Sequence, residues 1–322
     1  MMSPLPEELA RVIARKIEPF SMPVLTEAAQ SLSTGYRSRD NIRHTLSPLE
    51  VAAYLGSRFP STYAVASRVW DEVATRLGGL KPDSVLDAGA GPGTAAWAGA
   101  RHLADASCTL LERDPAWRTV ASEFGVALGA RAHFLPGDIL SIGTSRRFDV
   151  VVACYSLNEL VADGLENGIA RLWDCTGGVL IVIEPGTPLG FEVVRRVRGY
   201  VIAHGGTTIS PCTHDAICPM TDKDWCHFPE RVQRISIQRL LKKAELGYED
   251  EKFSYIALSK APVAPRASGR ILRKPIRAKG HVHLDSCERG SIVRHTISRK
   301  QGGLYRAAKE IGWGDLWPTD VE

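Results

Sequence analysis

The chain has 322 residues, of which 44% are hydrophobic and 24% charged, and this ordinary globular composition excludes a fibrous or wholly disordered protein. The length predicts one domain of about 200 residues with smaller appendages. No apolar run approaches the roughly 20 residues that would span a bilayer, and the first ten residues are acidic where a targeting peptide would be basic. We therefore predict a cytoplasmic protein.

Positive charge is concentrated near the C-terminus. The net charge is only +4, but residues 260–310 hold 13 Lys or Arg side chains against three acids, whereas the rest of the chain is net negative. Such a segment is either a solvated surface or a patch that binds a polyanion. Six of its cations lie in the fourteen residues from Arg266 to Lys279, interleaved with apolar residues. We predict that this stripe binds RNA phosphates through Arg270, Arg273, Lys274, Arg277 and Lys279.

The first 80 residues are predicted to be helical. Ser47, Pro48 and Glu50 supply the cap, the proline and the acid that are typical of a helix start. Another helix is expected over residues 61–77, because its apolar residues recur near helical spacing and two glycines follow it. We expect this N-terminal helical region, residues 1–80, to pack on the main domain.

From Ser84 onward, short apolar strands alternate with helical segments, which is typical of a doubly wound parallel sheet. Five buried strands are predicted, at residues 84–87, 108–112, 132–135, 148–153 and 179–184.

Residues 81–261 therefore form an α/β domain, which we expect to end with a helix over 231–244 and a strand over 253–259. An irregular insertion rich in Gly, Pro and Cys, residues 204–229, interrupts it. Residues 262–322 are predicted to be a basic C-terminal extension with a small β-rich fold.

A glycine-rich loop, Leu86–Thr94, directly follows the first predicted strand and precedes a helix. Its glycines allow a tight turn and let a ligand approach bare backbone, although such a loop alone is a weak signal. Glu112 ends the second strand 19 residues beyond Gly93, where an acid would accept hydrogen bonds from ribose hydroxyls. The alternative is that Glu112 is a solvated acid at a strand end.

Two acids favour S-adenosylmethionine over a dinucleotide as the ligand. Asp87 inside the loop suits an ammonium and a sulfonium, whereas it would repel a pyrophosphate. The run Leu86–Gly93 resembles motif I of the class I methyltransferases, and this resemblance implies that Asp138, after the third strand, holds the adenine amine. A dinucleotide-dependent oxidoreductase is the alternative. The residues expected to bind the cofactor are Asp87, Gly89, Gly91, Gly93, Glu112 and Asp138.

The segment after the fourth strand, Cys154–Leu160, is where the transferred methyl group would meet its acceptor. It lacks the Asp/Asn-Pro-Pro-Tyr/Phe pattern of amino-group methyltransferases. Tyr155, Asn158 and Glu159 are candidates for the substrate side, and Cys154 is either a small buried residue or a nucleophile. The segment therefore does not assign the catalytic residues.

Cysteines of the insertion predict a metal centre. Cys212, Cys218 and Cys226 lie within fifteen residues, and Cys287 follows 61 residues later. Thiolate ligation would fix a loop with little apolar content, and four sulfurs fit zinc or an iron–sulfur cluster. The absence of a C-x2-C pair favours the cluster. A mixed site and plain free thiols stay open, and the histidines available to a mixed site are His214, His227, His281 and His283.

Several of these segments together resemble the Rsm22 family over about residues 36–318. They are the glycine loop, the fifth-strand end at 184–188, the cysteine block at 211–231, the His281–His283 pair and the segments 304–306 and 313–316.

The resemblance, which is to a bacterial member, implies the class I Rossmann-like S-adenosylmethionine methyltransferase fold. It also implies a [4Fe-4S] cluster on Cys212, Cys218, Cys226 and Cys287, and action on the small ribosomal subunit during assembly. Two functions follow as expectations. The chain either methylates small-subunit ribosomal RNA or is a non-catalytic assembly factor that binds this RNA.

Overall fold

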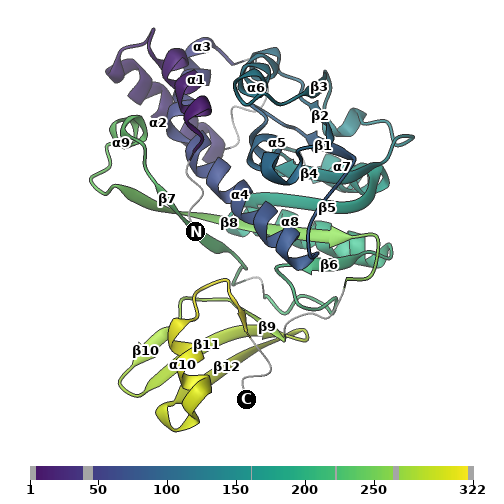
Figure 1. Ribbon diagram of the computed structural model, residues 1–322, viewed down its shortest axis with the longest axis vertical. Coiled ribbons are helices and arrows are strands. Elements are labelled where there is room, and N and C mark those ends of the chain that lie inside the picture. The colour runs from purple at the N-terminus through teal and green to yellow at the C-terminus, as the bar shows by residue number, and fades with distance from the viewer. Residues whose placement is uncertain (1–4, 39–45, 161, 222, 264–267, 318–322) are drawn as a thin grey trace.

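Two β-sheets of unequal size dominate the computed structural model (Figure 1). The structure describes residues 5–38, 46–160, 162–221, 223–263 and 268–317, so Arg266 of the predicted RNA-binding stripe lies outside the described residues. No helix in these ranges is long and apolar enough to cross a membrane.

Four helices occupy most of the N-terminal region: α1 Glu7–Ile17, α2 Met22–Ser38, α3 Pro48–Ser57 and α4 Phe59–Arg76. The predicted start of α3 is confirmed, because the Ser47 side chain accepts a hydrogen bond from the Glu50 N–H and the Glu50 carboxylate accepts one from the Ser47 N–H. Helix α1 packs against α3 and against α6 Pro115–Ala127 of the main domain.

All five predicted strands are present and parallel, in the spatial order β3-β2-β1-β4-β5. Beyond β5 the order continues with β8, which is antiparallel to both of its neighbours, and then β6. This order, with one reversed strand, is that of the class I methyltransferase fold and confirms the predicted fold class. The bounds are β1 Ser84–Ala88, β2 Ser107–Leu111, β3 Ala132–Leu135, β4 Phe148–Cys154, β5 Thr176–Pro185, β6 Thr207–Ser210 and β8 Tyr248–Ser259.

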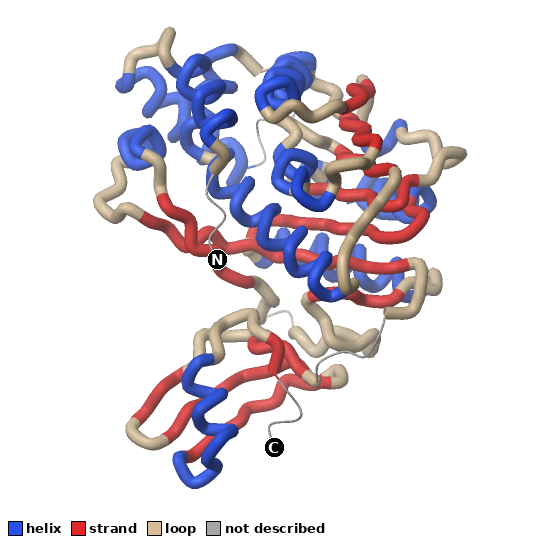
Figure 2. The backbone as a smooth tube through the Cα atoms, viewed as in Figure 1, coloured by secondary structure: helices blue, strands red, loops and turns tan. Residues whose placement is uncertain are grey.

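Helices cover both faces of this large sheet (Figure 2). Successive strand residues point to opposite faces, so Val85 packs with the N-terminal helices while Leu86 packs in the core on the other face. Burial on both faces explains why the central strands read as nearly continuous apolar runs. The remaining helical segments of this domain are α5 Thr94–Ala98, η1 Ala100–His102, η2 Ile139–Ser141, η3 Leu157–Glu159, α7 Ala162–Cys175 and α8 Pro188–Ala203.

The predicted helix over 231–244 is wrong in its first half. Residues Phe228–Gln233 form strand β7, which pairs with β8 from Phe228 opposite Phe253 to Gln233 opposite Tyr248. Only Ser236–Leu241 is helical, as α9. Strand β8 accordingly begins at Tyr248, five residues before the predicted start, because its exposed first half gains its hydrogen bonds from β7.

The smaller sheet lies below the large one and carries one helix on one face (Figure 2). Its core is small and consists of Ile271, Val282, Leu284, Ile297, Ala308, Ile311 and Trp317. The elements are β9 Gly269–Ile271, β10 Ile276–Ala278, β11 His281–Glu288, β12 Ser291–Ser298, η4 Arg299–Gln301, α10 Gly302–Glu310 and β13 Leu316–Trp317.

Candidate functional site

A cavity of about 760 Å³ lies at the carboxyl ends of the parallel strands, where open α/β sheets bind their ligands. Its wall combines the loops after β1, β2, β3 and β4 with residues of α2, α3 and α4. The N-terminal helices therefore close the cavity from the side opposite the sheet. Of the residues predicted to bind the cofactor, those that line the cavity are Gly89, Gly91, Glu112 and Asp138.

The glycines of the loop after β1 share a left-handed backbone conformation, but Gly89 and Gly91 differ in their surroundings. Gly89, Gly91 and Gly93 have φ angles of 69°, 55° and 80°, which strain residues with a Cβ. A Cβ on Gly89 would lie 2.6 Å from the Ser156 Cβ, so this position packs against the loop after β4. A Cβ on Gly91 would have no protein atom within 4 Å. Gly91 therefore presents bare backbone to the cavity.

Asp87 and Gly93 do not line the cavity. Asp87 is 1% exposed, and its Oδ2 accepts a hydrogen bond from the Ala96 N–H at 3.0 Å, at the start of α5. Burial raises the pKa of Asp87 to about 7. The structure thus places this carboxyl beneath the loop, where it fixes the junction with the helix, and not in direct reach of the cavity.

Glu112 is held at the cavity wall by two backbone hydrogen bonds. Its Oε2 accepts from the Gly91 N–H at 2.8 Å and its Oε1 from the Asp114 N–H at 2.7 Å. The residue is 8% exposed, which excludes the alternative of a solvated acid, and burial raises its pKa. Each carboxylate oxygen accepts more than one hydrogen bond, so the side chain retains capacity for a hydroxyl.

Asp138 is the N-terminal cap of the short helix η2, which follows β3. Its Oδ1 accepts from the Leu140 and Ser141 N–H groups at 2.8 and 3.1 Å. These bonds hold the carboxylate in the cavity wall after β3, so the third strand delivers an acid to the position predicted for the adenine amine.

All three substrate-side candidates line the cavity: Tyr155, Asn158 and Glu159. Tyr155 has a φ of 58°, a strained conformation that clusters at functional sites, and its N–H donates to the Ile183 carbonyl at 2.7 Å. Burial raises the pKa of Glu159 to about 7. Cys154 also lines the cavity, but burial raises the pKa of its thiol well above the usual value. It therefore lacks the thiolate that a nucleophile requires.

Glu184 was not predicted as a site residue, although it ends the fifth strand. It is 0% exposed, and its Oε1 accepts from the Leu157 N–H at 3.0 Å. Burial raises its pKa to about 8. This carboxyl orders the segment after β4 from below, and an acid at the end of an otherwise apolar strand is the signal that identifies it.

A second, much smaller cavity of about 40 Å³ lies between the two sheets, and all four predicted metal ligands line it: Cys212, Cys218, Cys226 and Cys287. All seven cysteines of the chain are free. Arg198, Arg270 and His214 line the same cavity, and His214 Nε2 lies 3.2 Å from Cys287 Sγ. His227, His281 and His283 do not line it.

Burial is the main reason why the pKa values of these thiols are raised. It raises the pKa of Cys226 well above the usual value and that of Cys287 to about 12, and neighbouring thiols add to both shifts. Thiolates would therefore form here only with a cation to offset their charge. Within the described ranges, no three His, Cys, Asp or Glu side chains are placed to hold a single metal ion.

The predicted RNA-binding stripe is not one continuous surface. Arg270 is 4% exposed, and its guanidinium donates to the Pro211 carbonyl at 2.9 Å, the Gly314 carbonyl at 2.7 Å and Glu72 Oε1 at 2.5 Å. The assignment of Arg270 to a phosphate contact is therefore wrong, because this side chain joins the two sheets internally.

The four other described cations of the stripe differ in their surroundings. Arg273 pairs with Asp224, and Arg277 donates to the Lys309 and Ile311 carbonyls. Lys274 and Lys279 are exposed. The sequence pattern did not separate buried from exposed cations, because burial of Arg270 depends on segments far away in the chain.

The strand order and the glycine-loop cavity together define a methyltransferase-like protein of class I. The chain belongs to the Rsm22 family, since the family model described as mitochondrial small ribosomal subunit Rsm22 matches residues 48–318.

Curated relatives share low identity over most of this chain. The ribosome assembly protein METTL17, mitochondrial, of Homo sapiens is 27% identical over 291 residues, which cover 83% of this chain and 62% of that protein. The Rsm22-cox11 tandem protein 2, mitochondrial, of Schizosaccharomyces pombe is 23% identical, covering 96% of this chain and 48% of its own length. The chain thus spans about half to two thirds of these relatives.

Solved structures are more distant. Magnesium protoporphyrin IX methyltransferase from Synechocystis PCC 6803, with bound SAM, is 15% identical with a TM-score of 0.41, covering 71% of this chain and 92% of that one. The YcgJ protein from Bacillus subtilis is 14% identical with a TM-score of 0.40, covering 63% and 99%.

Proposed function

We propose that the chain binds S-adenosylmethionine in the large cavity and acts on the RNA of the small ribosomal subunit during its assembly. The observation that carries the first part is the convergence of Gly91, Glu112 and Asp138 on one cavity of about 760 Å³. Gly91 leaves room for the ligand, Glu112 accepts from ribose hydroxyls and Asp138 from the adenine amine. When bound, the cofactor supplies an electrophilic methyl group.

The second part is supported by family membership and by the names of the relatives. The human relative is called a ribosome assembly protein, and the family model is named for the small ribosomal subunit. The relatives are named as mitochondrial, whereas the cytoplasmic location of this chain stays a prediction from its sequence.

A non-catalytic assembly factor is the second candidate. It is favoured by the absence of the amino-methyltransferase pattern after β4 and by burial of Cys154, which raises the pKa of its thiol and so disfavours a nucleophilic thiolate. In this case the ligand in the large cavity stabilises a shape that recognises RNA, and no methyl group moves.

Labelled S-adenosylmethionine and small subunits from a strain that lacks the protein separate the two candidates. Incorporation of label into RNA, lost in a variant that does not bind the cofactor, supports the enzyme. If the parent incorporates no label and yet restores subunit assembly, the proposal of RNA methylation is contradicted and the assembly factor is favoured.

We further propose that Cys212, Cys218, Cys226 and Cys287 hold a [4Fe-4S] cluster. Four free thiols line one cavity, and their spacing lacks the C-x2-C pair common in structural zinc sites. The cations Arg198 and Arg270 are positioned to offset the negative charge of a thiolate-ligated cluster. The cluster would supply iron–sulfur bonds that link the insertion to strand β11.

Metal analysis of anaerobically purified protein tests this proposal. We expect about four iron and four sulfide per chain. Cys218→Ala should abolish both, whereas Cys108→Ala, at a buried cysteine of β2 outside the small cavity, should retain them. Stoichiometric zinc without iron in protein from its native cell would contradict the cluster.

A further inference from the structure

Arg58 stands in the wall of the large cavity, although no motif in the sequence marks it. It links α3 to α4 and lines the cavity together with Tyr54, Thr62 and Tyr155. About a third of its side chain, 33%, is exposed. A guanidinium in this position is available to a bound molecule.

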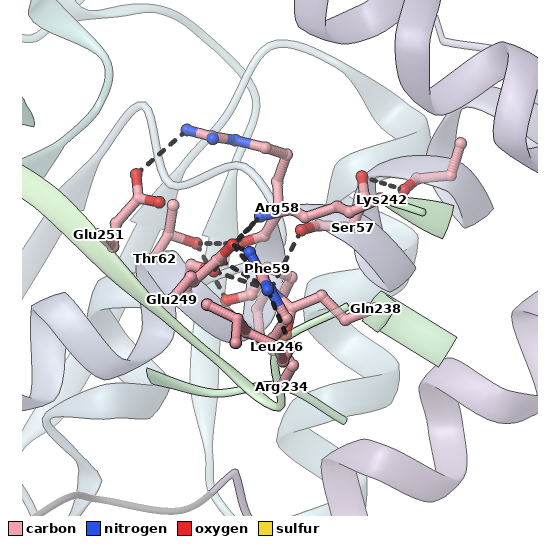
Figure 3. A network of polar contacts seen from close by, with 12 residues as sticks. Ser57, Arg58, Phe59, Thr62, Arg234, Gln238, Lys242, Leu246, Glu249 and Glu251 are labelled. Carbon is pink, nitrogen blue, oxygen red and sulfur yellow. Dashed lines mark hydrogen bonds and ion pairs between the residues drawn. The ribbon is translucent and has the colours of Figure 1, made fainter. Parts of the chain in front are cut away.

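The strand order locates Arg58 at the end of the cavity opposite Asp138. Asp138 follows β3, at one edge of the sheet, whereas Tyr155 follows β4 and Glu251 belongs to β8. The Arg58 side chain reaches Glu251, as Figure 3 shows. A ligand whose adenine lies near Asp138 and whose ribose lies near Glu112 therefore extends its amino-acid end toward Arg58.

At this end of the cavity, Arg58 and Tyr155 have hydrogen-bonding groups that the other described residues do not fully satisfy. In the described part of the chain, the partner of the Arg58 guanidinium is Glu251 Oε1 at 3.5 Å, which is long for a hydrogen bond. Nearby, the Tyr155 hydroxyl is buried and finds no hydrogen-bond partner among the described residues. Buried polar groups of this kind are normally satisfied, so a missing acceptor is indicated.

Charge explains which acceptor fits. The other charged residues that line the cavity are mainly acids, namely Glu112, Asp114, Asp138 and Glu159, with Arg113 beside Glu112. These acids suit the ammonium and sulfonium of the cofactor but would repel its carboxylate. A guanidinium binds a carboxylate strongly, through charge-assisted hydrogen bonds.

We propose that Arg58 binds the α-carboxylate of the methionine part of the cofactor, together with the Tyr155 hydroxyl, and that Glu251 holds Arg58 in place. The inference rests on the proposed S-adenosylmethionine site and assigns its specificity for the amino-acid end of the ligand.

Calorimetry with two ligands tests it. S-adenosylhomocysteine carries the amino-acid carboxylate, whereas 5′-methylthioadenosine has the same nucleoside without it. Arg58→Gln should weaken S-adenosylhomocysteine binding about tenfold or more while leaving 5′-methylthioadenosine binding nearly unchanged. Arg58→Lys should recover part of the loss, because it restores the charge but not the planar fork.

Arg68→Gln is the matched control. Arg68 lies on α4, the helix that follows Arg58; it donates to the Pro229 carbonyl and to Glu230, and it does not line the cavity. The Arg68→Gln variant should leave the ratio of the affinities for S-adenosylhomocysteine and 5′-methylthioadenosine unchanged. If Arg58→Gln weakens both ligands equally or neither, the assignment of the carboxylate is overturned. If the parent binds neither ligand, the proposed cofactor site itself fails.

Discussion

Three buried carboxyl groups at strand ends have the same structural role in this protein. Glu112 and Glu184 accept hydrogen bonds from the Gly91 and Leu157 N–H groups, in the segments after β1 and β4, and Asp87 accepts one from the Ala96 N–H of α5. Burial raises the pKa of all three. Their first contribution is therefore the shape of the cavity wall, and of the three only Glu112 also lines the cavity.

Gly91 offers the sharpest single-residue test of the cofactor site. Gly91→Arg should fill the open space beside the loop and abolish measurable S-adenosylhomocysteine binding in calorimetry, because the new side chain occupies the ligand's volume. Gly89 is less informative, because any side chain there meets Ser156 first.

Gly129→Arg is a suitable control for backbone strain. Gly129 has a φ of 65° and open space around its missing Cβ, like Gly91, but follows α6 away from the cavity. Both variants carry a similar conformational cost of roughly 1–2 kcal/mol. Equal ligand affinities in the two variants would show that the space beside Gly91 is not the binding site.

The sequence predicted those site residues that belong to a local motif. Gly91, Glu112 and Asp138 follow strands at fixed places, so their meeting at one sheet edge could be expected. Arg58 and its partner Glu251 are 193 residues apart and belong to no motif. Asp87 belongs to the motif, but only the path of the chain places it beneath the loop.

At the scale of elements, one carboxylate joins α4, α9 and β8. Glu249 accepts hydrogen bonds from Ser61 and Gln238 and pairs with Arg234 and Lys242 (Figure 3). Its side chain is 13% exposed. This network fastens the projecting β7–β8 hairpin to the N-terminal helices that close the large cavity.

The network should make stability depend on pH. Hydrogen bonds and ion pairs outweigh burial and lower the pKa of Glu249 in the folded protein. Its contribution to the free energy of unfolding is thus present above the unfolded-state pKa of about 4 and is lost as pH falls through the lower folded-state value. Glu249→Gln should cost about 2 kcal/mol near pH 7 in urea denaturation.

Glu166→Gln provides the comparison, because it removes an exposed carboxylate, 53% accessible, that pairs with Arg196. Its cost should stay below about 1 kcal/mol. The difference between the parent and Glu249→Gln should shrink as pH drops below about 4. A difference that is constant with pH would mean that the Glu249 charge contributes nothing.

Elements were predicted best where burial fixes their pattern. The parallel strands are apolar because both faces are covered, so their positions could be read from the sequence. The prediction of a helix over 231–244 was wrong in its first half. Phe228 and Val232 are buried as parts of strand β7, which forms through its pairing with β8.

At the scale of the whole molecule, the smaller sheet exposes Lys274 and Lys279 while Arg270 is buried. Alanine at both lysines should weaken binding to small-subunit RNA and lower the salt slope by about one for each phosphate that is no longer neutralised. S-adenosylhomocysteine affinity should stay unchanged. A gel-shift titration across salt concentrations measures the first effect and calorimetry the second.

The control variant replaces two exposed cations at the amino-terminal edge of the large sheet. Lys81 and Arg131 are exposed and precede β1 and β3, at the amino edge away from the cavity. Alanine at these positions lowers the net charge equally. If both double variants show the same decrease in affinity, binding depends on total charge and the smaller sheet has no special role.

The contacts of Arg270 also affect how the protein unfolds. Among the described residues, the core of the smaller sheet consists of seven buried apolar side chains, which is too few for an independently stable unit. Arg270 ties it to Pro211 and Glu72 of the main body, and separating the two parts would leave Glu72 without its cation. We therefore expect both sheets to melt in a single cooperative transition, and a chain cut between β8 and β9 to yield two fragments that each lack part of their core.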